Sequence, residues 1–381
     1  MMNIDTAFVR AASGGDYEHG ALVEPIVLST TFRRAADGSY PFGYEYARDA
    51  NPNRAELERA MAALEGGVEG AAFASGMAAA LAVFQTLLPR DHVVVSEDSY
   101  FGIRETLVGH FARRGLQVSF IDATDPQAVA ACVKSNTRLI FIETPSNPLL
   151  RVYDVAALAD IAHSVDALLV CDNTLATPLF QQPFRFGADL VVHSTTKYLN
   201  GHHDAQGGIV VAREQSERWR CIRRLQTALG AIPSAFNCWL SSRGLATLPC
   251  RLRRQSASAL AIAWRLEKLD SVHEVLYPGL ATSRYHSLAL RQMTGFGAVF
   301  SFRVKGDGRN ARSVAAAVRL FQRATSFGGP ESLIEHRASI EGPNTNVPDD
   351  LLRVAIGLED EEDLFADLAQ ALDFASRSFY E

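Results

Sequence analysis

The residues best suited to chemistry are an aspartate and a lysine that each follow a short apolar run. Asp172 comes directly after the run at 168–171, and Lys197 lies five residues after the run at 189–192. Runs of this kind, rich in Val and Leu and separated by a helical or loop segment, predict neighbouring parallel strands. Ligands of an open α/β sheet bind at the carboxyl ends of its strands. We therefore expect both side chains in one cleft.

This pair of side chains fits an aldehyde cofactor that has a ring nitrogen and a phosphate, namely pyridoxal 5′-phosphate (PLP). The Lys197 amine would bind the aldehyde covalently, and the Asp172 carboxylate would hold the protonated ring nitrogen. The hydroxyls of Ser194 and Thr196, just ahead of the lysine, would donate to the phosphate. Proton transfer by Lys197 needs a neutral amine, and burial beside a cationic ring lowers the pKa of a lysine.

The segment from Ser194 to Asp204 contains Thr196-Lys197-Tyr198 and Gly201-His202. It resembles the signature of the Cys/Met-metabolism PLP enzymes, which include cystathionine γ-synthase and the cystathionine β- and γ-lyases. The resemblance covers essentially the whole chain and is strongest to cystathionine γ-synthase. It implies PLP as the cofactor, small amino-acid substrates, and γ-replacement on an O-acyl-homoserine by cysteine to give cystathionine.

The resemblance also assigns roles to individual positions. Lys197 and Tyr100 are implied to be catalytic. The positions implied to bind the cofactor are Gly76, Met77, Tyr100, Asn147, Asp172, Thr174, Ser194, Thr196 and Lys197, with Tyr46 and Arg48 reaching the phosphate of a neighbouring subunit. The positions implied to bind the substrate are Tyr46, Asn147, Ser326 and Arg353.

Some of these positions have independent physical support and a structural alternative. A strand, the Ser75-Gly76 turn and a helix start form an anion site from free backbone N–H groups, although such turns are common. Tyr100 would stack on a flat pyridinium ring. Arg353 lies inside an apolar run, where a guanidinium either binds a carboxylate ligand or forms a buried ion pair.

Three features depart from the family pattern and leave the reaction open. Thr325 stands where the synthases and γ-lyases usually have a glutamate, which puts recognition of a distal amino group in doubt. Residues 339–348 replace the usual Thr-His-Ala segment near the substrate mouth. The usual Tyr-Gly-Gly segment is replaced by Tyr100-Phe101-Gly102, followed by Ile103 and Arg104. Arg104 either approaches a substrate carboxylate or is a solvated helix residue. A cystathionine β/γ-lyase, another γ-eliminase and an O-acylhomoserine sulfhydrylase therefore remain alternatives, and a conventional aminotransferase or a non-catalytic PLP-binding relative is a minor one.

The chain pattern predicts an α/β protein of PLP-dependent transferase fold type I. About seven strands are expected in a mostly parallel sheet with helices on both faces. Their expected ranges are 71–74, 92–96, 116–121, 138–143, 168–172, 189–193 and 208–212. We expect an N-terminal arm at 1–50 that contacts a neighbouring subunit, a PLP-binding domain at 51–230 and a smaller α/β domain at 231–381, in which Pro249 precedes a long helix. The shared arm implies a homotetramer built as a dimer of dimers.

Composition and charge limit which partners, cellular location and metal content are expected. The chain has 381 residues, 48% hydrophobic and 21% charged, with a net charge of −6, which disfavours nucleic acid or an anionic membrane as partner. We expect no transmembrane helix and no signal peptide. Five scattered cysteines favour reduced thiols and a cytoplasmic location. His202, His203 and Asp204 lie in one loop, but further metal ligands do not cluster with them, so we expect no metal.

Overall fold

The structure is a computed structural model that describes residues 2–12, 19–342 and 345–377. Its α-helices are α1 (Ile4–Ala11), α2 (Pro52–Glu65), α3 (Gly76–Phe84), α4 (Phe101–Thr106), α5 (Pro126–Cys132), α6 (Val155–Ser164), α7 (Thr177–Phe180), α8 (Glu217–Leu229), α9 (Ala235–Leu266), α10 (His286–Gln292), α11 (Gly308–Ala317), α12 (Arg337–Glu341) and α13 (Glu361–Arg377). Its strands are β1 (Glu69–Phe73), β2 (His92–Ser96), β3 (Gln117–Ile121), β4 (Thr137–Glu143), β5 (Leu168–Asp172), β6 (Leu190–His193), β7 (Gly208–Ala212), β8 (Val272–Leu276), β9 (Val299–Val304), β10 (Gln322–Arg323), β11 (Leu333–His336) and β12 (Leu351–Ala355).

The larger sheet has seven strands in the order β1-β7-β6-β5-β4-β2-β3. Neighbours from β3 to β6 pair in parallel, whereas β7 pairs antiparallel with both β6 and β1. β7 therefore runs opposite to the other six strands. The prediction of a mostly parallel, seven-stranded α/β sheet is confirmed, and each predicted strand lies within two residues of its observed bounds.

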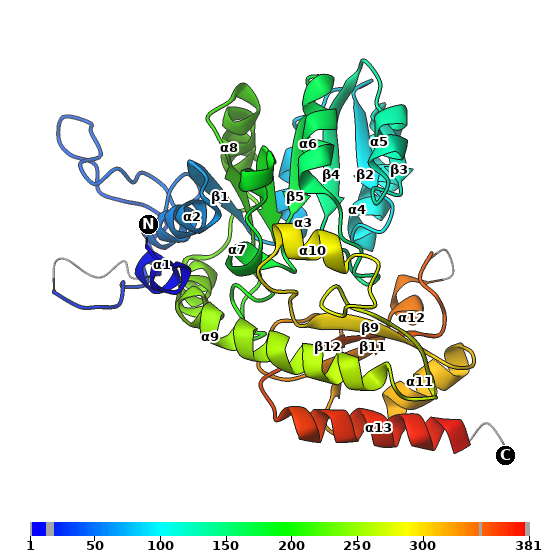
Figure 1. Ribbon diagram of the computed structural model, residues 1–381. Coiled ribbons are helices and arrows are strands. Elements are labelled where there is room, and N and C mark those ends of the chain that lie inside the picture. The colour runs from blue at the N-terminus through cyan, green and yellow to red at the C-terminus, as the bar shows by residue number, and fades with distance from the viewer. Residues whose placement is uncertain (1, 13–18, 343–344, 378–381) are drawn as a thin grey trace.

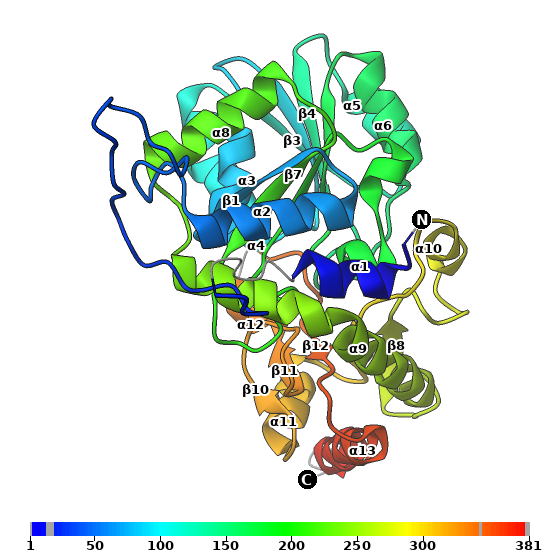
Figure 2. The ribbon, with the colours of Figure 1, turned by 90° about the vertical axis from the view of Figure 1, so that its left-hand side faces the viewer.

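Helices cover both faces of this sheet (Figures 1 and 2) because its strands are apolar on both sides. Along β2, Val93 and Val95 join a buried cluster with side chains of α3, α4 and α8. Val94, between them, joins a different cluster with α5 and α6. The alternation follows from the two-residue period of a strand. Burial of both faces leaves the strand ends as the accessible part of the sheet.

The smaller sheet has five strands in the order β10-β11-β12-β9-β8 and is antiparallel except between β10 and β11. Figure 1 shows α13 and the 32-residue helix α9 running alongside this sheet. α9 contacts α1 and α2 as well as β8, β9 and α13, and one large buried cluster contains side chains from all of these elements. The long helix thus joins the smaller sheet to the body that carries the larger one.

The segment at 19–50 contains no helix or regular strand and stands away from the body (Figure 2). Its apolar side chains are unusually exposed, with Leu22 91% and Phe42 78% accessible. Apolar patches of this kind often mark contact surfaces. The division at residues 50 and 230, and the neighbouring subunit that the arm would contact, stay predictions.

The expectation that Pro249 precedes the long helix is wrong, because Pro249 lies in the interior of α9. The helix begins after Ser234, whose side chain accepts from Asn237 N. An interior proline costs about 3 kcal/mol in helix propensity. Here buried side chains on both sides of Pro249, including Leu245, Leu248 and Leu252, keep the helix continuous through packing.

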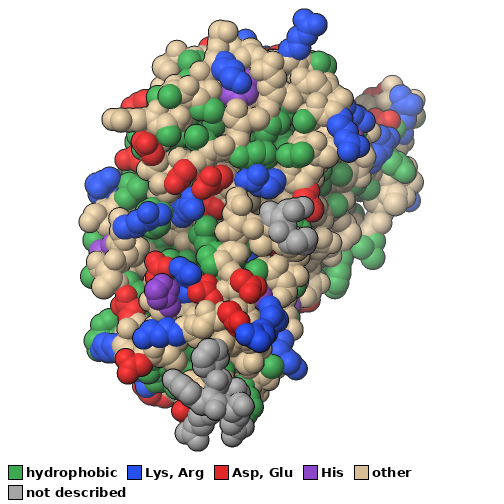
Figure 3. Space-filling view, turned by 90° about the vertical axis from the view of Figure 1, so that its right-hand side faces the viewer, with side chains coloured by type: hydrophobic (Ala, Val, Ile, Leu, Met, Phe, Trp, Pro, Cys, Tyr) green, Lys and Arg blue, Asp and Glu red, His purple; other side chains and the backbone are tan. Residues whose placement is uncertain are grey.

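Two surface properties can be read from the structure. None of the described helices is both long enough and apolar enough to cross a bilayer. On the face drawn in Figure 3, acidic and basic side chains are interspersed, and neither sign forms a continuous field.

The backbone of α9 at Gly244 lies very close to the backbone of the loop that follows Lys197. A Cβ at Gly244 of α9 would lie 2.2 Å from the carbonyl oxygen of Asn200, in the loop that follows Lys197. Because that contact is with backbone, we expect Gly244→Ala to lower the free energy of unfolding by roughly 1–3 kcal/mol, measured by urea denaturation. Gly109→Ala is the matched control, since its Cβ would have no neighbour within 4 Å. Equal stability of the two variants would contradict this packing.

Candidate active site

Four strands of the larger sheet end at one cavity of about 230 Å³. β6, β5, β4 and β2 are successive neighbours and run parallel, so their carboxyl ends lie at the same edge of the sheet. Of the thirteen predicted site residues, all but Tyr46 and Arg48 line this cavity, namely Gly76, Met77, Tyr100, Asn147, Asp172, Thr174, Ser194, Thr196, Lys197, Ser326 and Arg353.

Tyr46 and Arg48 lie elsewhere, in the arm. The Tyr46 side chain is 44% exposed, and the Arg48 guanidinium lies 5.7 Å from the centre of the Tyr46 ring. Arg48 Nη1 donates to the carbonyl oxygen of Thr227 at 3.4 Å. Within one chain these residues do not reach the cavity, so a role there requires a second chain, as the prediction states.

One end of the cavity is suited to an anion. Ser75 caps α3 by accepting from Ala78 N at 3.1 Å, which leaves the N–H groups of Gly76 and Met77 at the helix N-terminus. Gly76 is required by close approach, because a Cβ there would lie 2.7 Å from Ser194 Cβ. Backbone donors and the hydroxyls of Ser194 and Thr196 thus converge from α3 and from the loop after β6.

A buried pair of carboxyl groups lies at the ends of β5 and β4, where Asp172 and Glu143 are register partners. Asp172 Oδ1 accepts from Thr174 N at 3.0 Å and from Thr174 Oγ1 at 2.5 Å. Burial raises the pKa of Asp172, and these hydrogen bonds and the nearby His193 oppose the rise. Burial and the charge of Asp172 raise the pKa of Glu143 well above its usual range. Both shifts have the same direction, because burial and proximity disfavour a second negative charge on this pair.

Lys197 lies at the centre of the cavity wall, with its amine in a strongly desolvated position. Nζ donates to Ser326 Oγ at 2.8 Å and lies 5.1 Å from the centre of the Phe327 ring. Burial, followed by the positive charge of Arg353, lowers the pKa of Lys197 to about 8. Ser326 adopts φ +97°, a conformation that side-chain-bearing residues rarely hold outside functional sites. The amine is thus available in its neutral form near neutral pH.

Arg353 of β12 brings the smaller sheet to the cavity. Its Nη1 donates to Asn147 Oδ1 at 3.2 Å, and its Nη2 donates to the carbonyl oxygen of Ser326 at 2.6 Å. Nη2 also pairs with Glu335 Oε1 at 2.7 Å, so the buried ion pair considered as an alternative is present. Burial lowers the pKa of Arg353 to about 10. The guanidinium is held rigidly at the cavity wall, and its Nε has no partner among the described residues.

Sequence reasoning missed three charged residues near this site. Glu143 ends the strand expected at 138–143 but was given no role in the site, although it is the register partner of Asp172. Glu335 and Arg337 were not singled out. Both side chains are buried. The sequence feature that could have identified them is a charged residue within the apolar strand β11 and another directly after it.

The features that departed from the family pattern have different positions. Thr325 lines the cavity. Arg104 does not, because its Nη2 donates to the carbonyl oxygen of Glu97 and its guanidinium lies 4.1 Å from the Phe120 ring centre. Of the segment 339–348, residues 343–344 lie outside the described part. Thr345, Asn346 and Val347 line an adjoining cavity of about 590 Å³, which we call the outer cavity, and Asn147 lines both cavities.

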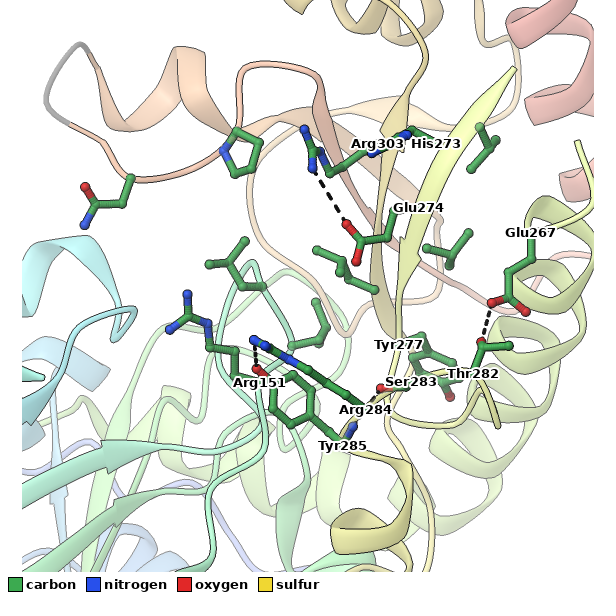
Figure 4. Close-up of a pocket in the computed structure, with 17 residues that line it drawn as sticks. Arg151, Glu267, His273, Glu274, Tyr277, Thr282, Ser283, Arg284, Tyr285 and Arg303 are labelled. Carbon is green, nitrogen blue, oxygen red and sulfur yellow. Dashed lines mark hydrogen bonds and ion pairs between the residues drawn. The ribbon is translucent and has the colours of Figure 1, made fainter. Parts of the chain in front are cut away.

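Charged side chains also gather in a second cavity and around His193. A separate cavity of about 570 Å³ contains several charged side chains (Figure 4), but Arg303 pairs with Asp350 and Glu274, and Arg284 donates to the Tyr285 hydroxyl. His193 Nε2 and Glu65 Oε1 form a hydrogen bond of 2.6 Å, and both side chains are buried. Across residues 2–12, 19–342 and 345–377, no group of three or more His, Cys, Asp or Glu side chains is arranged to hold a metal.

Comparisons with known proteins agree with the fold. A sequence model of the family described as "Cys/Met metabolism PLP-dependent enzyme" matches residues 5–373. Cystathionine γ-synthase of Mycobacterium bovis is 43% identical over 96% of each chain, and cystathionine γ-lyase of Dictyostelium discoideum is 40% identical over 97% of each. The crystal structure of cystathionine γ-synthase from Xanthomonas oryzae pv. oryzae, in complex with aminoacrylate and cysteine, superposes with a TM-score of 0.94 at 41% identity, covering 99% of each chain.

The fold and the lysine-containing cavity define a PLP-dependent enzyme. The chain belongs to the Cys/Met metabolism PLP-dependent enzyme family, with relatives that include cystathionine synthases and lyases. The residues present fit the cofactor: Gly76 leaves room for a phosphate beside Ser194, and the described residues form no ion pair with the buried carboxyl of Asp172, to which a protonated ring nitrogen could donate.

The lowered pKa of Lys197 can be tested by competitive acetylation of the PLP-free protein across pH 6–11, read by peptide mass spectrometry. Because burial disfavours the ammonium form, we expect labelling of Lys197 to rise with a midpoint near pH 8. At pH 8 about half of the Lys197 amine would be neutral, roughly a hundredfold more than for a lysine of ordinary pKa near 10.4. The exposed Lys305 serves as the internal reference. A midpoint near 10.4 would show that the amine is not desolvated.

Proposed function

We propose that this enzyme catalyses γ-replacement on an O-acyl-homoserine by cysteine, giving cystathionine. One observation carries the proposal: a lysine amine of lowered pKa shares a small cavity with a buried carboxylate and a buried arginine. That combination is suited to proton transfer at the α-carbon of a bound amino acid. The choice of γ-replacement is supported by the 43% identity to a cystathionine γ-synthase and by the likeness to one crystallised with aminoacrylate and cysteine.

In the proposed mechanism the substrate is held by groups from both sheets. Arg353 and Asn147 bind the α-carboxylate, because a guanidinium fixed by other contacts matches the two carboxylate oxygens. The main-chain N–H groups of Gly76 and Met77 and the hydroxyls of Ser194 and Thr196 hold the cofactor phosphate. PLP, when bound, supplies an electron-poor ring that accepts electron density from the α-carbon.

Proton movement is assigned to Lys197. Its amine is neutral in a useful fraction near neutral pH and would take the proton from the α-carbon. The Ser326 hydroxyl, at 2.8 Å, orients the amine between transfers. Asp172, fixed by Thr174, would keep the ring nitrogen of the cofactor protonated, and the aromatic side chain of Tyr100 would stack on its ring. When it is not bound to the cofactor, the Lys197 amine would also carry protons to and from the carbons next to the α-carbon while the γ-substituent departs.

A second candidate is γ-elimination, as in a cystathionine γ-lyase. The 40% identity to such a lyase supports this alternative. Thr325 at the cavity wall does not separate the two reactions, because it departs from the glutamate usual in both the synthases and the γ-lyases. A threonine there has no charge with which to bind a distal amino group of the incoming cysteine. Elimination would use the same residues and differ only in whether a thiol adds before the product is released.

The proposed reaction is tested by incubating the PLP-loaded enzyme with an O-acyl-homoserine and cysteine and identifying products by mass spectrometry. We expect cystathionine as the main product. We expect Lys197→Ala to lower turnover by at least about 10⁴-fold, because it removes the group that moves the proton, while the far-ultraviolet circular dichroism stays unchanged. Accumulation of 2-oxobutyrate and ammonia alone would favour elimination. Full turnover by the lysine variant without added amine would overturn the proposed role.

We further propose that the active sites are shared between subunits of a homotetramer arranged as a dimer of dimers. Tyr46 and Arg48 would bind the phosphate, and Tyr46 also the substrate, in the neighbouring cavity. The exposed arm and the distance of both residues from the cavity of their own chain support this arrangement. The predicted division into an arm (1–50), a PLP-binding domain (51–230) and a C-terminal domain (231–381), and the cytoplasmic location, belong to the same proposal.

Shared sites predict complementation between two impaired variants. Arg48→Ala should weaken phosphate binding in its neighbour's site, and Lys197→Ala inactivates its own. We expect mixed dimers, co-expressed with two affinity tags and purified on both, to regain about half of the wild-type activity per dimer, because one of the two sites is then intact. Each variant purified alone is the control. Mixed dimers no more active than the better parent would contradict a shared site.

A further inference from the structure

Arg337 stands at the boundary between the cofactor cavity and the outer cavity. It lines the smaller cavity, whereas its partner Glu341 lines the larger one. Its guanidinium also lies 5.3 Å from the ring centre of Phe101, another residue of the outer cavity. A cavity of about 230 Å³ is largely filled by the cofactor and the α-amino-acid part of a substrate. The part of the substrate beyond its γ-carbon must therefore pass close to this boundary.

The hydrogen bonds of Arg337 leave part of its donor capacity unused. Nε donates to Glu341 Oε1 at 2.9 Å, and Nη1 donates to Glu335 Oε1 at 3.1 Å. Nη2 has no partner among the described residues, although the Arg337 residue is only 2% exposed. A guanidinium has donors and no acceptor, so only an acceptor can satisfy Nη2. A buried donor without an acceptor is costly, which makes this nitrogen a candidate contact for a ligand.

The surrounding charges favour an acceptor from the substrate. Glu335 Oε1 is shared between Arg337 and Arg353, whereas Glu335 Oε2 accepts from neither of them. In the outer cavity, Glu97 and Asp98 pair with Arg151, and Glu341 also accepts from Thr345. The guanidinium groups of Arg337 and Arg353 both line the cofactor cavity. A positively charged group near Arg337 would meet repulsion from these groups.

We propose that Arg337 is a specificity-determining residue that selects amino acids with an oxygen acceptor, a carboxylate or an acyl carbonyl, beyond the γ-carbon and disfavours those with an ammonium group there. The inference rests on the proposed function and deepens it. It favours O-acyl substrates, which carry such a carbonyl, over substrates whose only distal group is an amine.

A charge series of non-reactive amino acids tests this selection without turnover. L-2-Aminoadipate, L-norleucine and L-lysine share the same chain to the ε-carbon and end in a carboxylate, a methyl and an ammonium-bearing methylene, and none carries a γ-leaving group. We expect the PLP-loaded protein to bind 2-aminoadipate about ten- to a hundredfold more tightly than norleucine by calorimetry, with lysine the weakest. Equal affinities for 2-aminoadipate and norleucine would overturn the proposal.

Variants of Arg337 distinguish recognition of the distal group of the ligand from a purely structural role of the arginine. We expect Arg337→Gln to abolish the advantage of 2-aminoadipate while changing norleucine affinity less than about twofold, and Arg337→Lys to keep part of it. Arg104→Gln is the comparison variant, because Arg104 also lines the outer cavity but its Nη2 already donates to the carbonyl oxygen of Glu97, so we expect this variant to keep the advantage of 2-aminoadipate. If Arg337→Gln weakened all three ligands equally, Arg337 would only position Arg353 through Glu335, and the proposal would fail. Loss of cystathionine formation with the binding series intact would instead fault the proposed reaction.

Discussion

The central constraint of the site is that the Lys197 amine lies where water is largely excluded. Burial alone disfavours the ammonium form of Lys197, and the adjacent Arg353 adds repulsion. Arg353 can itself stay charged in the interior because Glu335, Asn147 and the Ser326 carbonyl oxygen hold it. The reactive property of the lysine is thus maintained by an ion pair from a different sheet. The two parts of the molecule must be correctly assembled before the chemistry is available.

The same dependence explains why residues far apart in the sequence are close in space. Lys197 lies 129 residues before Ser326 along the chain, and Asn147 lies 206 residues before Arg353, yet each pair is joined by a hydrogen bond. The carboxyl ends of the parallel strands supply one wall, and β12 with the loop before β11 supplies the other. The helix α9 fixes the two walls relative to each other, because it packs on α2 next to the larger sheet and on β9 of the smaller sheet.

Strong local patterns made much of this predictable from the sequence. The apolar runs at 92–96 and 168–172 are strands with those bounds, since buried parallel strands consist of continuous β-branched and aliphatic residues. Asp172 and Lys197 followed from the rule that strand ends meet at one edge. The errors concern tertiary packing. Pro249 remains helical because long-range contacts outweigh its propensity, and the spatial roles of Arg104, Glu335 and Arg337 depend on partners that no local pattern specifies.

The backbone of Ser326 has a consequence for how this enzyme can change over time. At φ +97° a serine is strained, and a glycine would relieve the strain at no steric cost. That change would make the loop easier to fold but would delete the hydroxyl that contacts the Lys197 amine. Stability and activity therefore pull in opposite directions at this position. Selection for stability alone would therefore favour glycine at this position, at the expense of the hydroxyl that contacts the amine.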